Sequence, residues 1–289
     1  MNSRTYHITF LTPCFCAGAV QNKAELRSSS IRGALRWWFR ALGGSISEEK
    51  SVFGHVHGDK QSASSIVVRT RMDTRTGEIN WNAERNIQRQ GMDRSAYLLG
   101  FFCGRTHRLD STEGALPPGR RAEIHILFKR PPSESLELAL KMFFSIGAVG
   151  FRSSRAAGAI SSLENVLTTI SWEKIAEELA QRGFHVHLFP DQFRDWQHLI
   201  GRAGHILKHR LRGKQEGLGI SAGKNGTSPN ALGSAEPRQS SVVQFRPVLI
   251  NNQLRLSLIE APHERILGEK ANRAHGNRGS ILELAGLNS

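Results

Sequence analysis

Apolar and polar positions in the first half of the chain follow the periods of strands and helices. Tyr6, Ile8 and Phe10 share one face of an alternating run, which predicts a half-buried strand. Ser133 follows two prolines and precedes apolar positions at helical spacing, which predicts the start of a helix. The predicted elements of this half are a strand at residues 5–12, a helix at 31–42, strands at 65–71 and 121–129, and a helix at 133–147.

The second half shows the same mixture of helical and alternating patterns. Ser171 precedes a helical pattern that Gly183 ends. Residues 213–240 are rich in Gly, Ser, Asn and Lys and contain few large apolar side chains, so we expect a mobile loop there. The predicted elements are a helix beginning at Ser171, a strand at 184–188, a helix at 191–212, and strands at 241–248 and 253–259.

Composition and charge narrow the class of partner. The 289 residues include 39 Lys and Arg against 25 Asp and Glu, a formal charge of +14. Such a basic balance favours a polyanionic partner. No apolar run approaches the roughly 20 residues that span a bilayer, so we expect neither membrane insertion nor secretion. Three cysteines are an odd number and cannot close a disulfide framework, which favours a reducing, cytoplasmic location.

Residues 27–40 combine four arginines with two adjacent tryptophans and no acidic residue. On a helix, Arg32, Arg36 and Arg40 form one row, whereas Trp37 lies apart from the apolar stripe. Guanidinium groups pair with phosphates, and an indole stacks on a base with about 1–3 kcal/mol. The pattern therefore favours single-stranded nucleic acid. The alternative is that both tryptophans belong to the core and the arginines solvate a helix face.

A second basic stripe is predicted on the helix at 191–212. Its members project within roughly 80° of one another on an ideal helix, which would offer a row of positive charges to phosphates. An ordinary solvated face is the alternative, and Gly201 and Gly204 weaken the helix. The stripe consists of Arg194, His198, Arg202, His205, His209 and Arg212.

Residues 147–158, here called the glycine loop, follow the helix at 133–147. Glycines let backbone N–H groups approach a phosphate, and Arg152 and Arg155 add positive charge. The loop is not a P-loop, because no Gly-Lys-Ser/Thr ends it and it follows a helix instead of opening one. Alone, this pattern is weak evidence for a phosphate site.

Metal and catalytic patterns are less specific. Cys14, Cys16, Cys103 and His107 could supply four zinc ligands, but their spacing is unusual and free cysteines are commonly buried hydrophobes. We therefore predict no metal and no cofactor. The candidate proton-transfer residues of a ribonuclease are His55, His57, Asp59, His185 and His187. His-x-His within a strand also marks a solvent-facing side, so these residues leave both interpretations open.

A long motif carries a family resemblance. It comprises Phe10-Leu-Thr-Pro13, Gly18 and residues 25–44, ELRSSSIRGALRWWFRALGG. This motif resembles the first Cmr subunit of type III-B CRISPR effector complexes, a member of the RAMP superfamily. The similarity continues through Val52-Phe-Gly54, the strand that begins at Ser65, the glycine loop, and Gln244-Phe-Arg-Pro247. One departure is Ala156-Ala157, where relatives tend to carry basic or aromatic residues.

The resemblance implies an α+β fold of two tandem ferredoxin-like (RRM-like) domains with antiparallel sheets, over residues 1–160 and 161–289. It also implies a non-catalytic subunit that contacts the 3′ part of a CRISPR RNA, the target RNA, or both, beside other Cas subunits. A RAMP-type endoribonuclease and a basic scaffold that touches only proteins are the alternatives. The predicted RNA-binding residues are Arg27, Ser30, Arg32, Arg36, Trp37, Arg40, Arg152, Arg155, Arg194, His198 and Arg202.

Overall fold

The computed structural model describes residues 2–16, 18, 24–56, 61–73, 115–212, 217–218, 220, 231–233, 240–268 and 280–287. The first part contains β1 (Asn2–Phe10), β2 (Cys14–Phe15), α1 (Ser28–Ala41), α2 (Ile46–Phe53), β3 (Ile66–Met72), β4 (Ala115–Leu116), β5 (Arg121–Phe128), α5 (Glu134–Ile146) and β6 (Ile160–Ser162). The second part contains η2 (Leu163–Asn165), α6 (Thr169–Ala180), β7 (His185–Phe193), α7 (Trp196–His205), the π-helix η3 (Ile206–Leu211), β8 (Val243–Ile250), β9 (Gln253–Glu260), α8 (His263–Leu267) and α10 (Ile281–Leu284).

The first sheet is antiparallel and has the strand order β3-β5-β1-β6. Its connectivity is β1-α1-β3-β5-α5-β6, the β-α-β-β-α-β order of a ferredoxin-like unit. The register pairs Tyr6 with Ile124 and Ile8 with Ala122, which places the apolar set of both strands on one face. The strands and helices predicted for this half are confirmed, although α1 begins at Ser28 rather than at Ile31. Ser133 caps α5 by accepting from the N–H of Leu136.

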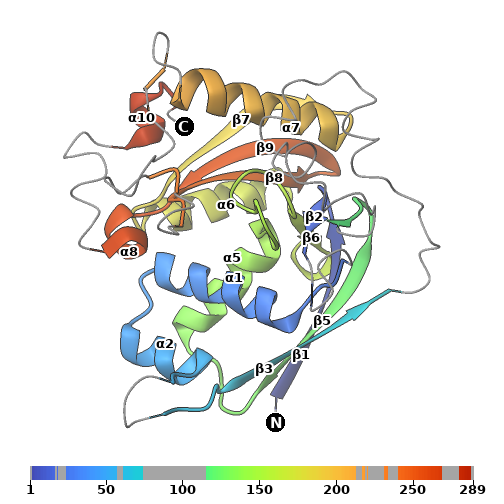
Figure 1. Cartoon of the computed structure of the whole chain (residues 1–289), viewed down its shortest axis with the longest axis vertical. Helices are drawn as coiled ribbons and strands as arrows, with labels where there is room; N and C mark the ends of the chain where they lie inside the picture. Colours follow the sequence, from blue (N-terminus) through green and yellow to red (C-terminus); the bar gives the residue numbers. More distant parts are fainter. Residues whose placement is uncertain are drawn as a thin grey trace.

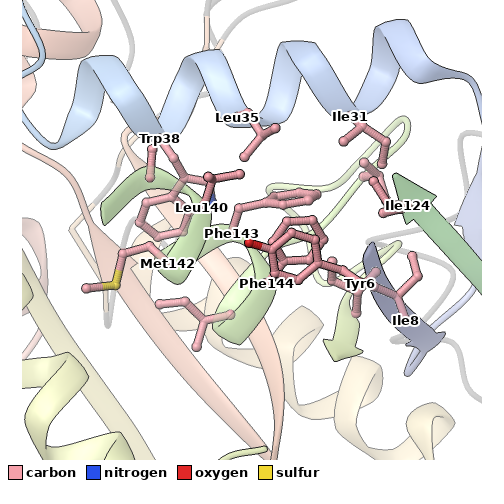
Figure 2. Close-up of a cluster of buried hydrophobic side chains, with 14 of the residues drawn as sticks. Tyr6, Ile8, Ile31, Leu35, Trp38, Ile124, Leu140, Met142, Phe143 and Phe144 are labelled. Atoms are coloured by element: carbon pink, nitrogen blue, oxygen red, sulfur yellow. The ribbon is translucent and has the colours of Figure 1, made fainter. Parts of the chain in front are cut away.

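Helices α1 and α5 cover the apolar face of this sheet (Figure 1). Figure 2 shows Leu35 and Trp38 of α1 directed at Phe143 and neighbouring side chains of α5. Tyr6 of β1 stacks on Phe144, with ring centroids 3.6 Å apart. Trp38 is 1% exposed and belongs to the core. The packing of its apolar face therefore determines the position of helix α1, independently of any role of its arginines.

The second sheet is also antiparallel, with the order β7-β9-β8. Asn251 and Asn252 have positive φ values of 49° and 60°, as a two-residue hairpin between β8 and β9 requires. Helix α7 lies along the side of this sheet that faces away from the first sheet (Figure 1). The three strands have the order of the first three strands of a ferredoxin-like domain. No fourth strand pairs with them in the part of the chain that the structure describes, so the second ferredoxin-like domain stays a prediction.

Three predicted boundaries in this half are wrong. The strand predicted at residues 184–188 extends to Phe193. The helix predicted from residue 191 begins at Trp196, because Gln192 and Phe193 continue β7 and pair with β9. Asp195 caps this helix, and its last residues form the π-helix η3. Helix α6 is capped by Thr168, and Ser171 is its third residue, where it completes a capping box. Most of the predicted mobile loop at 213–240 lies outside the described residues, which include 217–218, 220, 231–233 and 240 of that range.

The two parts of the chain share a core and several polar contacts. One hydrophobic cluster joins Phe143 of α5 to Trp172 of α6 and Val248 of β8. Arg265 donates to the carbonyl of Ala41 at 3.0 Å, and Arg182 donates to that of Leu42 at 3.3 Å. Arginines of the second part therefore satisfy carbonyls at the C-terminus of α1. The division at residue 160 stays a prediction, since no break in the core marks it.

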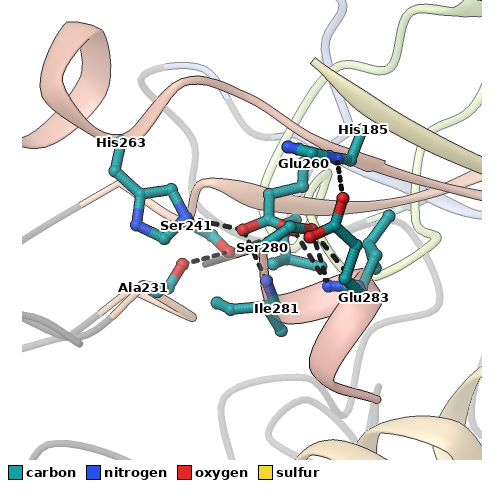
Figure 3. A network of polar contacts seen from close by, with 10 residues as sticks. His185, Ala231, Ser241, Glu260, His263, Ser280, Ile281 and Glu283 are labelled. Atoms are coloured by element: carbon teal, nitrogen blue, oxygen red, sulfur yellow. Dashed lines mark hydrogen bonds and ion pairs between the residues drawn. The ribbon is translucent and has the colours of Figure 1, made fainter. Parts of the chain in front are cut away.

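The C-terminal helix α10 is fastened to the second sheet through Glu260 (Figure 3). The buried carboxylate of Glu260 accepts hydrogen bonds from the N–H groups of Ile281 and Leu282, at 2.9 and 3.0 Å, and from the hydroxyl of Ser280 at 2.7 Å. His263 lies 2.6 Å from the same carboxylate. Glu260 is 1% exposed, so these contacts replace the water that the carboxylate loses.

No helix in the described part of the chain is long and apolar enough to cross a membrane.

Candidate nucleic-acid interface

Helix α1 holds two of its predicted arginines beside a buried carboxylate of α2. Arg40 donates to both carboxylate oxygens of Glu49, at 2.7 and 2.6 Å, and Arg36 also bonds Glu49. Glu49 is 4% exposed. Burial alone would raise the pKa of Glu49, but hydrogen bonds from Arg40 and Arg36 outweigh it and hold that pKa below its ordinary value. One of the two positive charges is therefore neutralised within the protein.

The other predicted residues of α1 differ in what they offer to a ligand. Arg27 is the exposed N-cap residue, and Ser30 is half-buried in the first turn. Arg32 donates to the carbonyl of Phe53 at 2.6 Å, which ties α1 to the end of α2. Trp37 packs partly against the core and meets Trp38 edge-on, with ring centroids 5.1 Å apart. The role of Glu49 does not follow from the sequence pattern, because helical projection considers one helix at a time and Glu49 lies on α2.

The second predicted stripe does not form one helix face. Arg194 precedes α7 and donates to Asp195 at 3.0 Å, and the Nδ1 atom of His198 lies 2.6 Å from the same residue. Arg202 lies 3.6 Å from Asp191 and over the ring of Phe189. The aspartates at 191 and 195 therefore offset much of the charge at this end. His205 and His209 continue along the helix with ring centroids 4.6 Å apart.

The glycine loop has a compact and strained backbone. Its positive φ values are 88° at Gly150, 61° at Arg152, 67° at Ala156 and 63° at Gly158. A Cβ atom at Gly158 would lie 1.9 Å from the carbonyl oxygen of Val149, so only glycine fits there. The N–H of Phe151 donates to the carbonyl of Phe15 at 2.7 Å, which joins the loop to β2. The loop is therefore joined by its backbone to β2 near the start of the chain.

An aromatic ring and two arginines meet at this loop. Phe151 is 48% exposed, unusually open for a large apolar side chain, and the guanidinium of Arg152 lies 5.5 Å from its ring centroid. Burial and the positive charge of Arg212 lower the pKa of Arg152. Arg212, which follows η3, is thus close enough to repel Arg152. The structure brings together one arginine of the glycine loop and one of the second basic stripe, and it adds Phe151. The sequence signal for Phe151 was its position in a glycine-rich loop outside any helical pattern.

Arg155, the other predicted arginine of the loop, lies in the interior. It is 4% exposed, and its guanidinium donates to the carbonyls of Leu232 and Val243 and to the hydroxyl of Ser241. Its charge also lies 5.9 Å from the ring centroid of Phe245. The predicted phosphate contact of Arg155 does not agree with this placement, because protein carbonyls already occupy its donors.

The predicted metal and proton-transfer residues are dispersed. Cys14 and Cys16 are buried, and the neighbouring Cys16 thiol and burial raise the pKa of Cys14. Four of the predicted residues lie outside the described part of the chain: Cys103, His107, His57 and Asp59. Among the described residues, no three metal-ligating side chains form a group. His55 pairs with Ser62 through its backbone, and His185 lies 3.3 Å from Glu283. His187 meets the ring of Phe189, with centroids 4.5 Å apart.

A hollow of about 400 Å³ lies on the other face of the first sheet. His7 in its wall is engaged by Glu164, with 2.6 Å between its Nδ1 atom and the carboxylate. None of the predicted site residues lines this hollow. The lining residues are His7, Ile8, Thr9, Asp73, Arg121, Ala122, Glu123 and Leu163.

The class of protein follows from the sequence of the first part of the chain. The sequence model of the RAMP superfamily, a family of proteins, matches residues 7–161, more than half of the chain. The chain belongs to the RAMP superfamily.

Particular relatives confirm the resemblance carried by the motif at residues 10–44. The chain is 28% identical over 144 residues to the Cmr subunit Cmr1-1 of the Pyrococcus furiosus CRISPR system, across 47% of this chain and 40% of that protein. It is 27% identical over 177 residues to subunit Cmr1-2 of the same organism, across 55% of this chain and 95% of that protein. The match thus spans less than half the length of the first relative.

Two solved structures share the fold. The crystal structure of apo Cmr1 from Pyrococcus furiosus aligns with a TM-score of 0.58 and 20% identity, over 91% of this chain and 88% of that chain. A chain of the cryo-EM structure of the type III-B Cmr-β complex bound to cognate target RNA aligns with a TM-score of 0.54 and 11% identity, over 89% of this chain and 93% of that chain. The α+β class with antiparallel sheets is therefore confirmed.

Proposed function

We propose that the chain is a non-catalytic, RNA-binding subunit of a type III CRISPR effector complex in the cytoplasm. It would contact the 3′ part of the CRISPR RNA, the target RNA, or both, beside other Cas subunits. The curated relatives are Cmr subunits, and one structure with this fold comes from a complex bound to target RNA, which supports the proposal. The formal charge of +14 agrees with a polyanionic partner.

The observation that carries the proposal is the meeting of Phe151, Arg152 and Arg212 at the glycine loop. A base can stack on the exposed part of the Phe151 ring, an interaction of about 1–3 kcal/mol. A phosphate near Arg152 and Arg212 accepts charge-assisted hydrogen bonds and offsets the repulsion between the two guanidinium groups. Stacking and phosphate pairing at one loop are the two interactions that an unpaired strand supplies without sequence readout.

The remaining predicted residues are assigned to a second, weaker part of the interface. They lie on α1 and around α7, where carboxylates offset several of the positive charges. These residues are Arg27, Ser30, Arg32, Arg36, Trp37, Arg40, Arg194, His198 and Arg202. Trp37 would contribute only the part of its indole that the core leaves exposed.

The direct test measures binding of a labelled single-stranded RNA to the full chain by fluorescence anisotropy. Phe151→Ala and Arg152→Ala should each lower the affinity about tenfold. Arg152→Ala should also reduce the slope of log K against log salt by about one. Leu163→Ala, which truncates an exposed apolar side chain outside the loop, is the matched control. The proposal is wrong if both loop variants bind like the wild type.

The same mixtures separate the two alternatives. An endoribonuclease would shorten the RNA, and this cleavage would be lost on substitution of His55, His57 or Asp59. A scaffold that touches only proteins would show the same RNA affinity after Arg36→Glu combined with Trp37→Ala. If the chain is a non-catalytic RNA-binding subunit, gel electrophoresis of these mixtures should show intact RNA throughout, and the loop variants should bind RNA more weakly.

A further inference from the structure

The Gln244-Phe-Arg-Pro247 segment of β8 contains an arginine that lies inside the protein. Arg246 is 3% exposed, and burial lowers its pKa to about 9. One terminal nitrogen donates to the carbonyl of Ser153 in the glycine loop, and the other donates to the side chain of Gln244 at 2.8 Å. Gln244 in turn donates to the carbonyl of Ser241 at 2.7 Å. Burying a charged side chain costs free energy, so a buried arginine that is kept in the fold suggests a role beyond stability.

Arg155 makes the reciprocal connection from the loop to the second sheet. Its guanidinium bonds Ser241 and the carbonyls of Leu232 and Val243, and the backbone N–H of Phe245 donates to the carbonyl of Ser154 at 3.2 Å. The carbonyls of Ser153 and Ser154 are therefore both held by β8, the first by the side chain of Arg246 and the second by the backbone N–H of Phe245.

These anchors directly follow the strained residue that carries the proposed contact. Arg152 has a φ of 61°, a left-handed conformation that costs a residue with a side chain about 1–3 kcal/mol and persists where its surroundings impose it. The carbonyl of Arg152 accepts from the N–H of Arg155 at 2.7 Å, which closes a tight turn over Ser153 and Ser154. Fixing the carbonyls in that turn fixes the direction in which Arg152 leaves it.

We propose that Arg246, with Arg155, is a positioning residue that holds the glycine loop so that Arg152 and Phe151 face the RNA. The proposal rests on the proposed function, since it names what orients the RNA contact. Neither buried guanidinium touches the ligand: each acts through the loop backbone. Arg246 of the second part of the chain therefore orients Phe151 and Arg152 of the first part, which make the contact with RNA.

A double-mutant cycle on the full chain tests this assignment. The four proteins are the wild type, Arg152→Ala, Arg246→Met and the double variant, with the labelled single-stranded RNA as probe. Methionine keeps the apolar volume, removes the donor to Ser153 and relieves the cost of a buried charge, so the variant should stay folded. Arg246→Met should lower the affinity about tenfold and reduce the salt slope by about one, although residue 246 is buried. Adding it to Arg152→Ala should cost less than about twofold more.

Arg246→Lys is the conservative variant, and it should retain part of the affinity because one donor remains. Amide hydrogen exchange should show faster exchange in the loop of both Arg246 variants while the rest of the chain is unchanged. If Arg246→Met fails to fold, Arg246→Lys and the exchange measurement decide alone.

The outcomes separate this inference from the function on which it rests. Additive losses in the double variant, unaltered exchange in the loop, or unchanged affinity of a folded Arg246→Met would each overturn the positioning role. Wild-type affinity of Arg152→Ala would instead overturn the proposed contact itself. A non-additive pair with faster loop exchange supports both.

Discussion

Helix α1 and the glycine loop both carry arginines next to an aromatic residue, but the protein treats their charges in opposite ways. In α1, Arg36 and Arg40 share the buried carboxylate of Glu49. In the loop, burial and then the positive charge of Arg212 lower the pKa of Arg152. An internal carboxylate stabilises the free protein and competes with a phosphate, whereas two repelling guanidinium groups gain when an anion arrives. Local charge density alone does not distinguish these two situations.

The largest expected effect concerns the aromatic residues of α1. Trp38→Ala should lower the free energy of unfolding by about 3–5 kcal/mol, because it leaves a cavity in the core. Trp37→Ala should cost less than half of this, since its ring is only partly buried. Urea denaturation of both variants measures the difference. Equal losses would mean that Trp37 is as much a core residue as Trp38, which would remove it from the proposed interface.

The next effect compares the two arginine pairs directly. Arg152→Ala with Arg212→Ala should weaken binding of single-stranded RNA about 100-fold, because two phosphate contacts are lost. Arg36→Ala with Arg40→Ala removes the same formal charge, but the loss should be about threefold, since Glu49 already offsets one of the two charges. The comparison holds only if salt concentration is matched. A larger loss for the α1 pair would reverse the order of the two sites.

The sequence predicted elements better than it predicted contacts. Strands β1, β3, β5, β8 and β9 follow from alternation, because a half-buried sheet imposes period two on its own residues. The start of α7 did not follow, since pairing with β9 holds residues 192 and 193 in β7 despite a helical pattern. Interior strand pairing is a long-range effect that local propensity does not contain.

The candidate site divides in the same way. The motif located the glycine loop, yet Arg152 and Arg155, three residues apart, have different environments. The turn that the N–H of Arg155 closes on the carbonyl of Arg152 leaves Arg152 half-buried beside Phe151 and Arg155 in the interior. The acids that partner Arg36, Arg40 and Arg202 are visible in the sequence, but their proximity depends on how α2 and β7 are placed.

A smaller effect is expected from the carboxylate of α1. Glu49→Gln should lower the free energy of unfolding by about 1–2 kcal/mol, a value below that of a fully buried ion pair because both arginines are partly exposed. The same variant should bind RNA about threefold more tightly, because Arg36 and Arg40 become available to phosphate. Chemical denaturation and anisotropy measure the two quantities. Unchanged or weaker RNA binding would show that α1 takes no part in the interface.

The smallest effect supplies the control for that experiment. Glu260 is a second buried carboxylate, and it holds the N-terminus of α10 instead of an arginine pair. Burial would raise its pKa, but hydrogen bonds from His263, Ile281, Leu282 and Ser280 outweigh burial and keep the pKa below the ordinary 4.5. Glu260→Gln should therefore cost about 1 kcal/mol of stability and leave the RNA affinity unchanged.

The pH dependence of Glu260→Gln follows from the sign of this shift. A carboxyl group whose pKa is lowered by folding contributes stability above its unfolded pKa, and this stability is lost as the pH falls through the lowered native value. The difference in unfolding free energy between the wild type and Glu260→Gln should thus be constant near neutral pH and shrink below about 4.5. Denaturation curves over a pH series measure it. If Glu260→Gln also tightened RNA binding, the gain expected for Glu49→Gln would reflect a loosened protein and not the release of arginines in α1.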